Sequence, residues 1–150
     1  NAGLDRLMPL YKRADIFFCN VQEAERILKL PSDTDIKDLL KKMRELGPKL
    51  VVITDGPKGA YAFDGTDAWF MPPYPDPKPP YERTGAGDAF ASTFTAAIAL
   101  GKTVAEALTW GPINSMSVVQ EIGAQRGLLS RAKLEEFLKN APADYKVRKL

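Results

Sequence analysis

Thr84-Gly85-Ala86-Gly87-Asp88-Ala89-Phe90 is a loop with two glycines that opens a helix rich in alanine, which we expect to run to about Leu100. Backbone N–H groups converge where such a loop enters a helix. The helix dipole adds partial positive charge at the same point, so the junction favours an anion. An aspartate in the first turn would repel a resting phosphate, but it is well placed to take a proton from a hydroxyl that attacks that phosphate.

These residues together indicate phosphoryl transfer. The N–H groups of Gly85, Ala86, Gly87 and Asp88 would form the anion hole, and the Asp88 carboxylate would be the general base. The alternative is that the two glycines only make a turn and that Asp88 is an ordinary helix-start residue. A motif this short does not decide between the two by itself.

The chain before this loop alternates between helical and strand patterns. The run at 50–53, Leu-Val-Val-Ile, is continuously apolar, which is typical of a strand covered on both faces in a parallel sheet. Amphipathic spacing predicts helices, and β-branched or aromatic residues between turn signals predict strands. The expected elements are a helix at 4–11, a strand at 15–19, helices at 20–30 and 36–46, and strands at 50–53, 59–63 and 68–71.

The chain around and after the loop is helical. Six prolines between positions 72 and 80 predict an extended segment. Thr103 and Glu106 form a capping box for a helix that we expect to be interrupted at Gly111-Pro112 and to resume through Val119. Ser130 caps a last helix. The order of elements predicts an α/β fold, and 150 residues without an internal repeat predict one domain over residues 1–150.

Composition excludes several classes of function. Without histidine, the chain has no Ser-His-Asp or Cys-His pair and no His-based zinc site. A net charge of +2 with interspersed signs argues against a nucleic-acid or membrane partner, and no apolar stretch is long enough to span a bilayer. Cys19 is expected to be a small buried strand residue, which fits a reducing cytoplasm. Because the chain starts without Met, we expect a processed start or a piece of something longer.

The stretch at 84–90 resembles the signature of the ribokinase-like (PfkB) carbohydrate kinase family, in which a sequence of the type Asp-Thr-Thr-Gly-Ala-Gly-Asp precedes a helix of small residues. Two further motifs occur in the family's order and spacing. Asn20-Val21-Gln22-Glu23 resembles the Asn-x-x-Glu motif that serves Mg²⁺ and the phosphates. The segment 51–60 resembles the strand and turn that lie along the nucleotide.

The resemblance implies roles for individual residues. Asn20 would position phosphate and Glu23 would position the metal, although the same pair also reads as a capping box. Thr54 and Gly56 would contact the phosphates or ribose, with a plain turn between strands as the alternative. Asn114 would lie in the adenine pocket, with a helix-surface asparagine as the alternative.

The resemblance also implies a fold and an activity. The fold would be the C-terminal half of a three-layer ribokinase-like structure, with a mostly parallel sheet, a β-hairpin and flanking helices. The activity would be ATP- and Mg²⁺-dependent phosphorylation of a sugar or nucleoside hydroxyl. The N-terminal half, which supplies most sugar contacts and the lid in that family, would be absent. We therefore expect the isolated chain to be inactive and to self-associate, most simply as a dimer.

Two readings stay open at this point. The chain could instead be a non-catalytic nucleotide-binding or dimerising half-domain. Furthermore, Glu82-Arg83 stands where the family has Asp-Thr, and in several members that aspartate helps to hold a monovalent cation. Glu82 keeps the charge on a longer side chain, which leaves open whether this chain uses such a cation.

Overall fold

The structure is a computed structural model that describes residues 2–150, and its contacts divide the chain into two compact units. The first unit contains the residues up to Gly56, together with Ala60–Phe70 and Lys149–Leu150. The second contains Pro57–Gly59 and Met71–Arg148. The single domain expected from the chain length stays a prediction.

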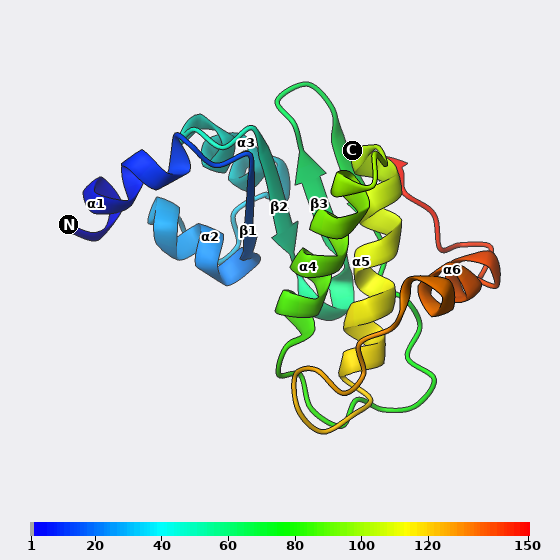
Figure 1. Ribbon diagram of the computed structural model, residues 1–150. Helices are drawn as coiled ribbons and strands as arrows, with labels where there is room; N and C mark the ends of the chain where they lie inside the picture. The colour runs from blue at the N-terminus through cyan, green and yellow to red at the C-terminus, as the bar shows by residue number, and fades with distance from the viewer. Residues whose placement is uncertain (1) are drawn as a thin grey trace. The chain divides into compact units, whose positions relative to one another are not determined.

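The strands form a five-stranded sheet in the order β1-β2-β3-β4-β5 (Figure 1). β1 pairs in parallel with β2, so that Asn20 lies opposite Thr54 at the carboxyl ends of both strands. β2 pairs antiparallel with β3, which places Thr54 opposite Ala60. The strands are β1 Ile16–Asn20, β2 Leu50–Thr54, β3 Ala60–Phe63, β4 Ala68–Met71 and β5 Arg148–Lys149.

The lengths of the connections explain why the sheet is mixed. Two helices, α2 Val21–Leu28 and α3 Ile36–Glu45, separate β1 from β2, and a crossover of that length permits parallel pairing. Only a short 3₁₀ turn, Gly56–Lys58, separates β2 from β3, so those two strands must run antiparallel. The α/β class is confirmed. The expected mostly parallel arrangement holds for β1 and β2 and is wrong for β2 and β3.

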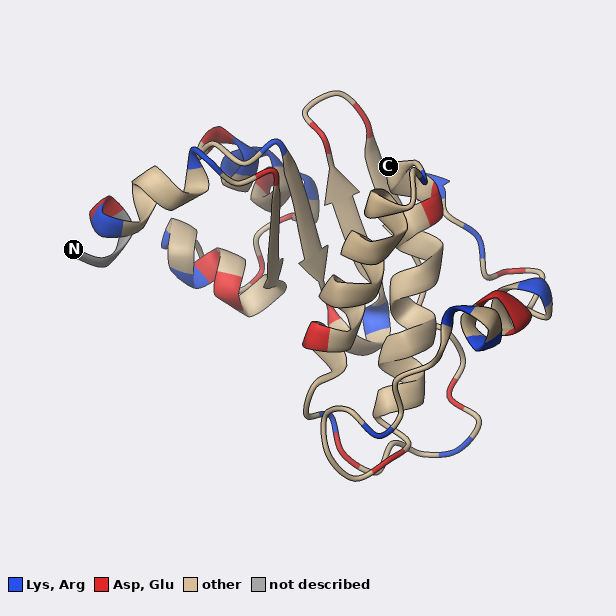
Figure 2. Cartoon of the chain, viewed as in Figure 1, with Lys and Arg blue, Asp and Glu red and all other residues tan. Residues whose placement is uncertain are grey.

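The core of the first unit lies where α2 and α3 pack on the sheet. Leu39 and Met43 of α3 are fully buried, as are Val51 and Ile53 of β2. Val52 points to the opposite face of the strand and is equally buried. The prediction that this strand is covered on both faces is therefore confirmed. Figure 2 shows acidic and basic residues interspersed along the two helices.

Cys19 lies in β1 and is buried, with 7% of its surface exposed, as the sequence predicted. Burial, with a smaller contribution from the negative charge of Glu23, raises the pKa of the Cys19 thiol to about 12. The thiol therefore stays protonated at neutral pH. Because the thiolate is the reactive form, burial argues against a role for Cys19 as a nucleophile.

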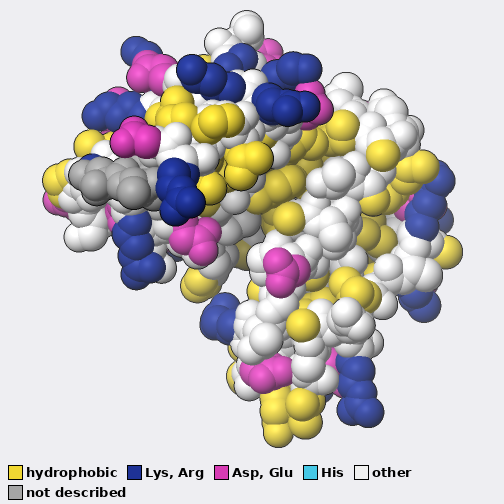
Figure 3. All heavy atoms as spheres, turned by 60° about the vertical axis from the view of Figure 1, so that its left-hand side comes forward, with side chains coloured by type: hydrophobic (Ala, Val, Ile, Leu, Met, Phe, Trp, Pro, Cys, Tyr) yellow, Lys and Arg dark blue, Asp and Glu magenta, His cyan; other side chains and the backbone are white. Residues whose placement is uncertain are grey.

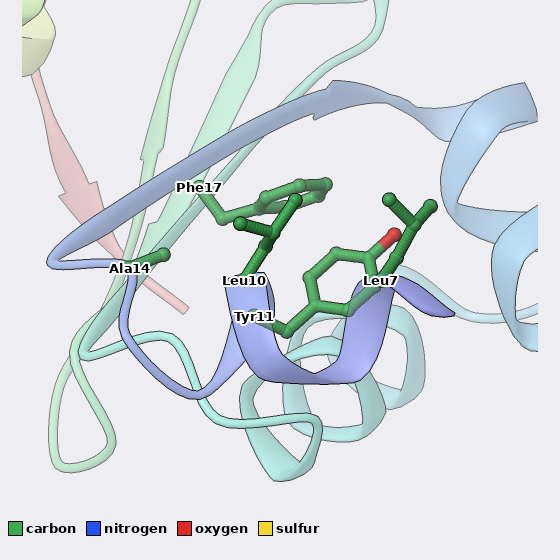
Figure 4. Close-up of a pocket in the computed structure, with 5 residues that line it drawn as sticks. All are labelled: Leu7, Leu10, Tyr11, Ala14 and Phe17. Atoms are coloured by element: carbon green, nitrogen blue, oxygen red, sulfur yellow. The ribbon is translucent and has the colours of Figure 1, made fainter. Parts of the chain in front are cut away.

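An apolar hollow of about 190 Å³ lies where α1, Ala2–Tyr11, meets the start of β1 (Figure 4). The Tyr11 and Phe17 rings meet edge to face there, with 5.0 Å between centroids. Its lining offers an anion no charge partner, so it is not the phosphate site that the sequence predicts. On the face drawn in Figure 3, hydrophobic, basic and acidic side chains are intermixed. The hollow is lined by Leu7, Leu10, Tyr11, Ala14 and Phe17.

The second unit is built on two helices that pack against each other, α4 Ala86–Ala99 and α5 Val104–Val118, with α6 Arg131–Lys139 packed on α5. Phe90 and Phe94 of α4 are buried, and their rings stack with 6.3 Å between centroids. Gly111 of α5 faces Phe90 closely: a Cβ atom at this position would lie 2.7 Å from two atoms of the phenylalanine ring. The close packing of α4 on α5 therefore depends on a glycine here.

The predicted interruption of α5 at Gly111-Pro112 is wrong, since the helix runs unbroken from Val104 to Val118. Pro112 has no N–H group, so it leaves one carbonyl of the preceding turn without its helical partner. Both Gly111 and Pro112 are buried, and tertiary packing overrides the local preference. None of the helices within residues 2–150 has the length and apolar character that a membrane span requires.

Candidate active site

The turn at Gly85 sets the geometry of the loop that enters α4. Gly85 is the N-cap residue, and its φ of 81° lies in the left-handed region that favours glycine. A Cβ atom here would lie 2.5 Å from the Cβ and 2.7 Å from the Cα of Ala124. Backbone conformation and close packing thus both require glycine at position 85.

The first turn of α4 presents unused donors. Gly85 has no side chain with which to cap the helix. The Ala86 N–H donates to the Arg83 carbonyl at 3.3 Å, and the Ala89 N–H donates to the Gly85 carbonyl at 2.8 Å. The N–H groups of Gly85, Gly87 and Asp88 donate to no residue that the structure describes. Three of the four predicted anion-hole donors are therefore open, while Ala86 is partly engaged in the turn.

Asp88 lies in the same turn and is exposed to solvent. Its carboxylate makes no ion pair or hydrogen bond with the described residues. A structural aspartate at a helix start is commonly held by a backbone N–H or a basic side chain. Asp88 has neither among these residues, so its carboxylate is available to a ligand.

The first unit contains a second group of predicted site residues, at the carboxyl ends of β1 and β2. The Asn20 Oδ1 atom accepts from the Glu23 N–H, and Glu23 Oε2 accepts from the Asn20 N–H, both at 2.9 Å. The capping box that the sequence offered as an alternative role is thus formed. Thr54 lies opposite Asn20, and in parallel sheets ligands bind beyond these strand ends.

Gly56 follows β2 and adopts a φ of 51°, and the space around its Cβ position is open to at least 4 Å. Its exposed backbone can therefore approach a ligand closely. The carboxyl ends of β1 and β2 thus bring together Asn20, Glu23 and Thr54, with Gly56 two residues further along the chain.

Asn114 is not on the helix surface but buried, with 5% of its surface exposed. Its Nδ2 atom donates to Thr93 Oγ1 at 2.7 Å, and its Oδ1 atom accepts from the Leu129 N–H at 2.9 Å. Both ends of the amide are therefore used inside the second unit. The predicted contact between Asn114 and a nucleotide stays a prediction.

Ser115 makes a contact with the start of α4 that the sequence did not predict. Its hydroxyl donates to the Ala86 carbonyl at 2.7 Å and so ties α5 to the start of α4. Serine inside a helix gives no local signal of such a contact, because its partner lies 29 residues away. Ser115 thus fixes α5 to the residue that directly follows Gly85.

Comparisons with known proteins identify the family of the chain. Residues 2–131 match the model of the pfkB family of carbohydrate kinases. The chain belongs to this family. It is 35% identical over 119 residues to the cytidine kinase of Thermococcus kodakarensis, covering 79% of the chain and 42% of that protein. It is 34% identical over 93 residues to the ribokinase of Bacillus subtilis, covering 62% of the chain and 31% of that protein.

Solved structures of a ribokinase and of a carbohydrate kinase share the fold. The ribokinase of Arabidopsis thaliana, complexed with ribose and ATP, superposes with a TM-score of 0.81 at 29% identity, over 88% of this chain and 43% of that one. A carbohydrate kinase from Agrobacterium tumefaciens gives 0.72 at 32% identity, over 99% and 45%. The ribokinase-like fold is thereby confirmed. This pfkB family chain spans less than half the length of these relatives, and its assignment to the C-terminal half stays a prediction.

Proposed function

We propose that the chain supplies the nucleotide-binding and catalytic part of an ATP-dependent kinase that phosphorylates a hydroxyl group of a sugar or nucleoside. The observation that carries the proposal is the start of α4, where the open N–H groups of Gly85, Gly87 and Asp88 lie in the same turn as the unpaired Asp88 carboxylate. The cytidine kinase and ribokinases among the relatives support this class of acceptor.

In the proposed reaction, the Asp88 carboxylate accepts a proton and the open N–H groups bind the transferring phosphoryl group. The acceptor hydroxyl gives its proton to the Asp88 carboxylate while its oxygen bonds to the γ-phosphorus of ATP. The bond between that phosphorus and the bridging oxygen breaks, and ADP leaves with the oxygen. The open N–H groups stabilise the charge on the transferring phosphoryl group, which is the main contribution that a protein makes to this chemistry.

We propose that magnesium enters as MgATP. Among residues 2–150, no three Cys, Asp or Glu side chains lie close enough to hold a metal ion by themselves. Mg²⁺ usually binds through one or two carboxylates together with substrate phosphates and waters. Glu23 fits that pattern, because its Oε2 atom is used in the capping box while Oε1 is left for a ligand.

We propose two different roles for the remaining predicted residues. Asn20, Thr54 and Gly56 would lie along the phosphates and ribose, since they gather where two parallel strands end. Asn114 would support the nucleotide site by holding the backbone at Leu129, since its amide oxygen accepts from the Leu129 N–H.

The replacement Asn20→Asp separates capping from nucleotide binding. Asp caps a helix as well as Asn does, so the free energy of unfolding should stay within about 0.5 kcal/mol of the parent. One added negative charge near the phosphates should weaken MgATP binding about tenfold or more at an effective dielectric constant of ~20. Chemical denaturation and calorimetry measure the two effects.

Asn20→Ala is the matched control, because it loses about 1 kcal/mol of capping energy without adding charge. Unchanged MgATP affinity in Asn20→Asp would remove Asn20 from the phosphate site.

The proposed function is tested on the complete gene product and on the 150-residue chain. A panel of sugars and nucleosides is supplied with MgATP, and ADP release is measured. We expect turnover by the complete protein and, for the chain alone, MgATP binding without turnover, because the sugar pocket and lid would lie outside it. Nucleotide binding without turnover by the complete protein would instead support a non-catalytic nucleotide-binding role.

We propose a cytoplasmic location, which suits a chain with one buried cysteine. Self-association of the isolated chain stays a prediction, and light scattering over a concentration series tests it.

A further inference from the structure

The segment 120–128, which follows α5, lies against the Gly85 turn. Ala124 of this segment fills the space where a side chain at Gly85 would stand. The carbonyl of Val119, just before the segment, accepts from the Tyr81 N–H at 2.8 Å. This hydrogen bond fixes the chain that leads into the Gly85 turn to the end of α5. The conformation of the Gly85 turn therefore depends on the place of segment 120–128.

The two ends of the segment are fixed by contacts with α5. At its start, the Glu121 N–H donates to the Val118 carbonyl at 3.1 Å. Towards its end, Gly127 packs directly on the backbone of Ser117 and Val118, and beyond it the Leu129 N–H donates to Asn114. The middle of the segment, which carries Ala124, needs a separate anchor.

Glu82 provides that anchor. Its Oε1 atom accepts from the Gly123 N–H at 2.5 Å, and the contact is partly buried. Hydrogen bonds from a backbone N–H to a carboxylate are shorter and stronger than neutral ones. Gly123 has a φ of 89°, in the left-handed region that glycine adopts at little energetic cost. A glycine therefore suits the backbone conformation in which this contact forms. Glu82 thus holds the residue next to Ala124.

We propose that Glu82 is a positioning residue for phosphoryl transfer. Its carboxylate holds Gly123, Gly123 places Ala124, and Ala124 confines the Gly85 turn whose N–H groups receive the phosphoryl group. The inference rests on the proposed function. Preorganised donors are effective because they need no rearrangement during the reaction, so loosening the turn should slow the chemical step. The hydrogen bond also engages a negative charge that would otherwise repel the phosphates.

The test compares Glu82→Ala with Glu82→Gln in the complete protein. Glu82→Ala removes the acceptor, so kcat should fall about 10- to 100-fold, as for the loss of a hydrogen bond to a charged group. The Gly123 amide should exchange with deuterium faster, while the amides of α4 and α5 keep their protection. Glu82→Gln keeps an oxygen that can accept from Gly123 and should restore most of kcat and the slow exchange.

Three outcomes would overturn the proposal. Parental kcat in Glu82→Ala would show that the contact does not matter for the reaction. Equal losses in both variants would assign the effect to the charge of Glu82, as at a cation site, and addition of potassium to the parent would then change its rate. A parent protein without kinase activity would overturn the proposed function, and the role of Glu82 in it, even if the exchange of the Gly123 amide follows expectation.

Discussion

Replacing Asp88 with asparagine in the complete protein is expected to lower kcat about 10²- to 10⁴-fold, the usual value of a general base. Asparagine keeps the size and shape of the side chain but cannot take the proton of the acceptor hydroxyl. The dissociation constant of MgATP should stay the same or fall slightly, because the substitution removes a negative charge beside the phosphates. Steady-state kinetics and calorimetric ATP binding on the same variant measure both quantities.

The effect of this substitution on activity can be separated from an effect on stability, because the Asp88 carboxylate makes no hydrogen bond or ion pair with the described residues. Loss of the side chain's function should therefore cost little stability, at most about 1 kcal/mol for a residue in the first turn of a helix. Retained kcat would make Asp88 an ordinary helix-start residue. Lost MgATP binding would make it a ligand-binding residue and would contradict its role as the base.

The fold was predictable where local and tertiary preferences agree. The run Leu50–Ile53 is typical of a covered strand, and it forms one. Thr103 and Glu106 are typical of a helix start, and the contacts between the two residues form the capping box. The continuity of α5 was not predictable. Gly111-Pro112 is a helix breaker in isolation, and only the packing of Gly111 on Phe90, 21 positions earlier in the chain, shows why the helix continues.

The candidate site was predictable in part for a similar reason. Gly85 and Asp88 lie in one short stretch, so their shared turn could be read from the sequence. Asn20 and Glu23 remained ambiguous, because the residues that would serve phosphate and metal are the same ones that make a capping box. The contact between Glu82 and Gly123 spans 41 positions in an irregular segment, where no periodicity indicates which residues meet.

Alanine at Gly85 is expected to damage both stability and activity. The left-handed conformation costs a non-glycine residue about 1–2 kcal/mol, and the added methyl group would meet the backbone of Ala124, which costs a further ~1–3 kcal/mol. We therefore expect a loss of about 2–5 kcal/mol in the free energy of unfolding, measured by chemical denaturation, together with weakened MgATP binding.

Gly101→Ala is the matched control for the cost of placing alanine in the left-handed backbone conformation. Gly101 has a φ of 82°, close to the 81° of Gly85, and the space around its Cβ position is open to at least 4 Å. Its substitution should cost only the conformational part, about 1–2 kcal/mol, with MgATP affinity unchanged. Equal destabilisation in Gly85→Ala and Gly101→Ala would contradict the close packing of Ala124 on the turn.

Gly87→Ala completes the comparison, because it adds the same methyl group at a helical position with open space around it. Alanine is the better helix former, so the free energy of unfolding should stay the same or rise by about 0.5–1 kcal/mol. The Gly87 N–H nevertheless belongs to the proposed anion hole, and a methyl group beside it would crowd an approaching phosphate. We expect kcat/KM to fall in a protein that is no less stable than its parent. Such a separation of activity from stability would locate the phosphate at the start of α4, whereas parental kcat/KM would show that the phosphate binds elsewhere.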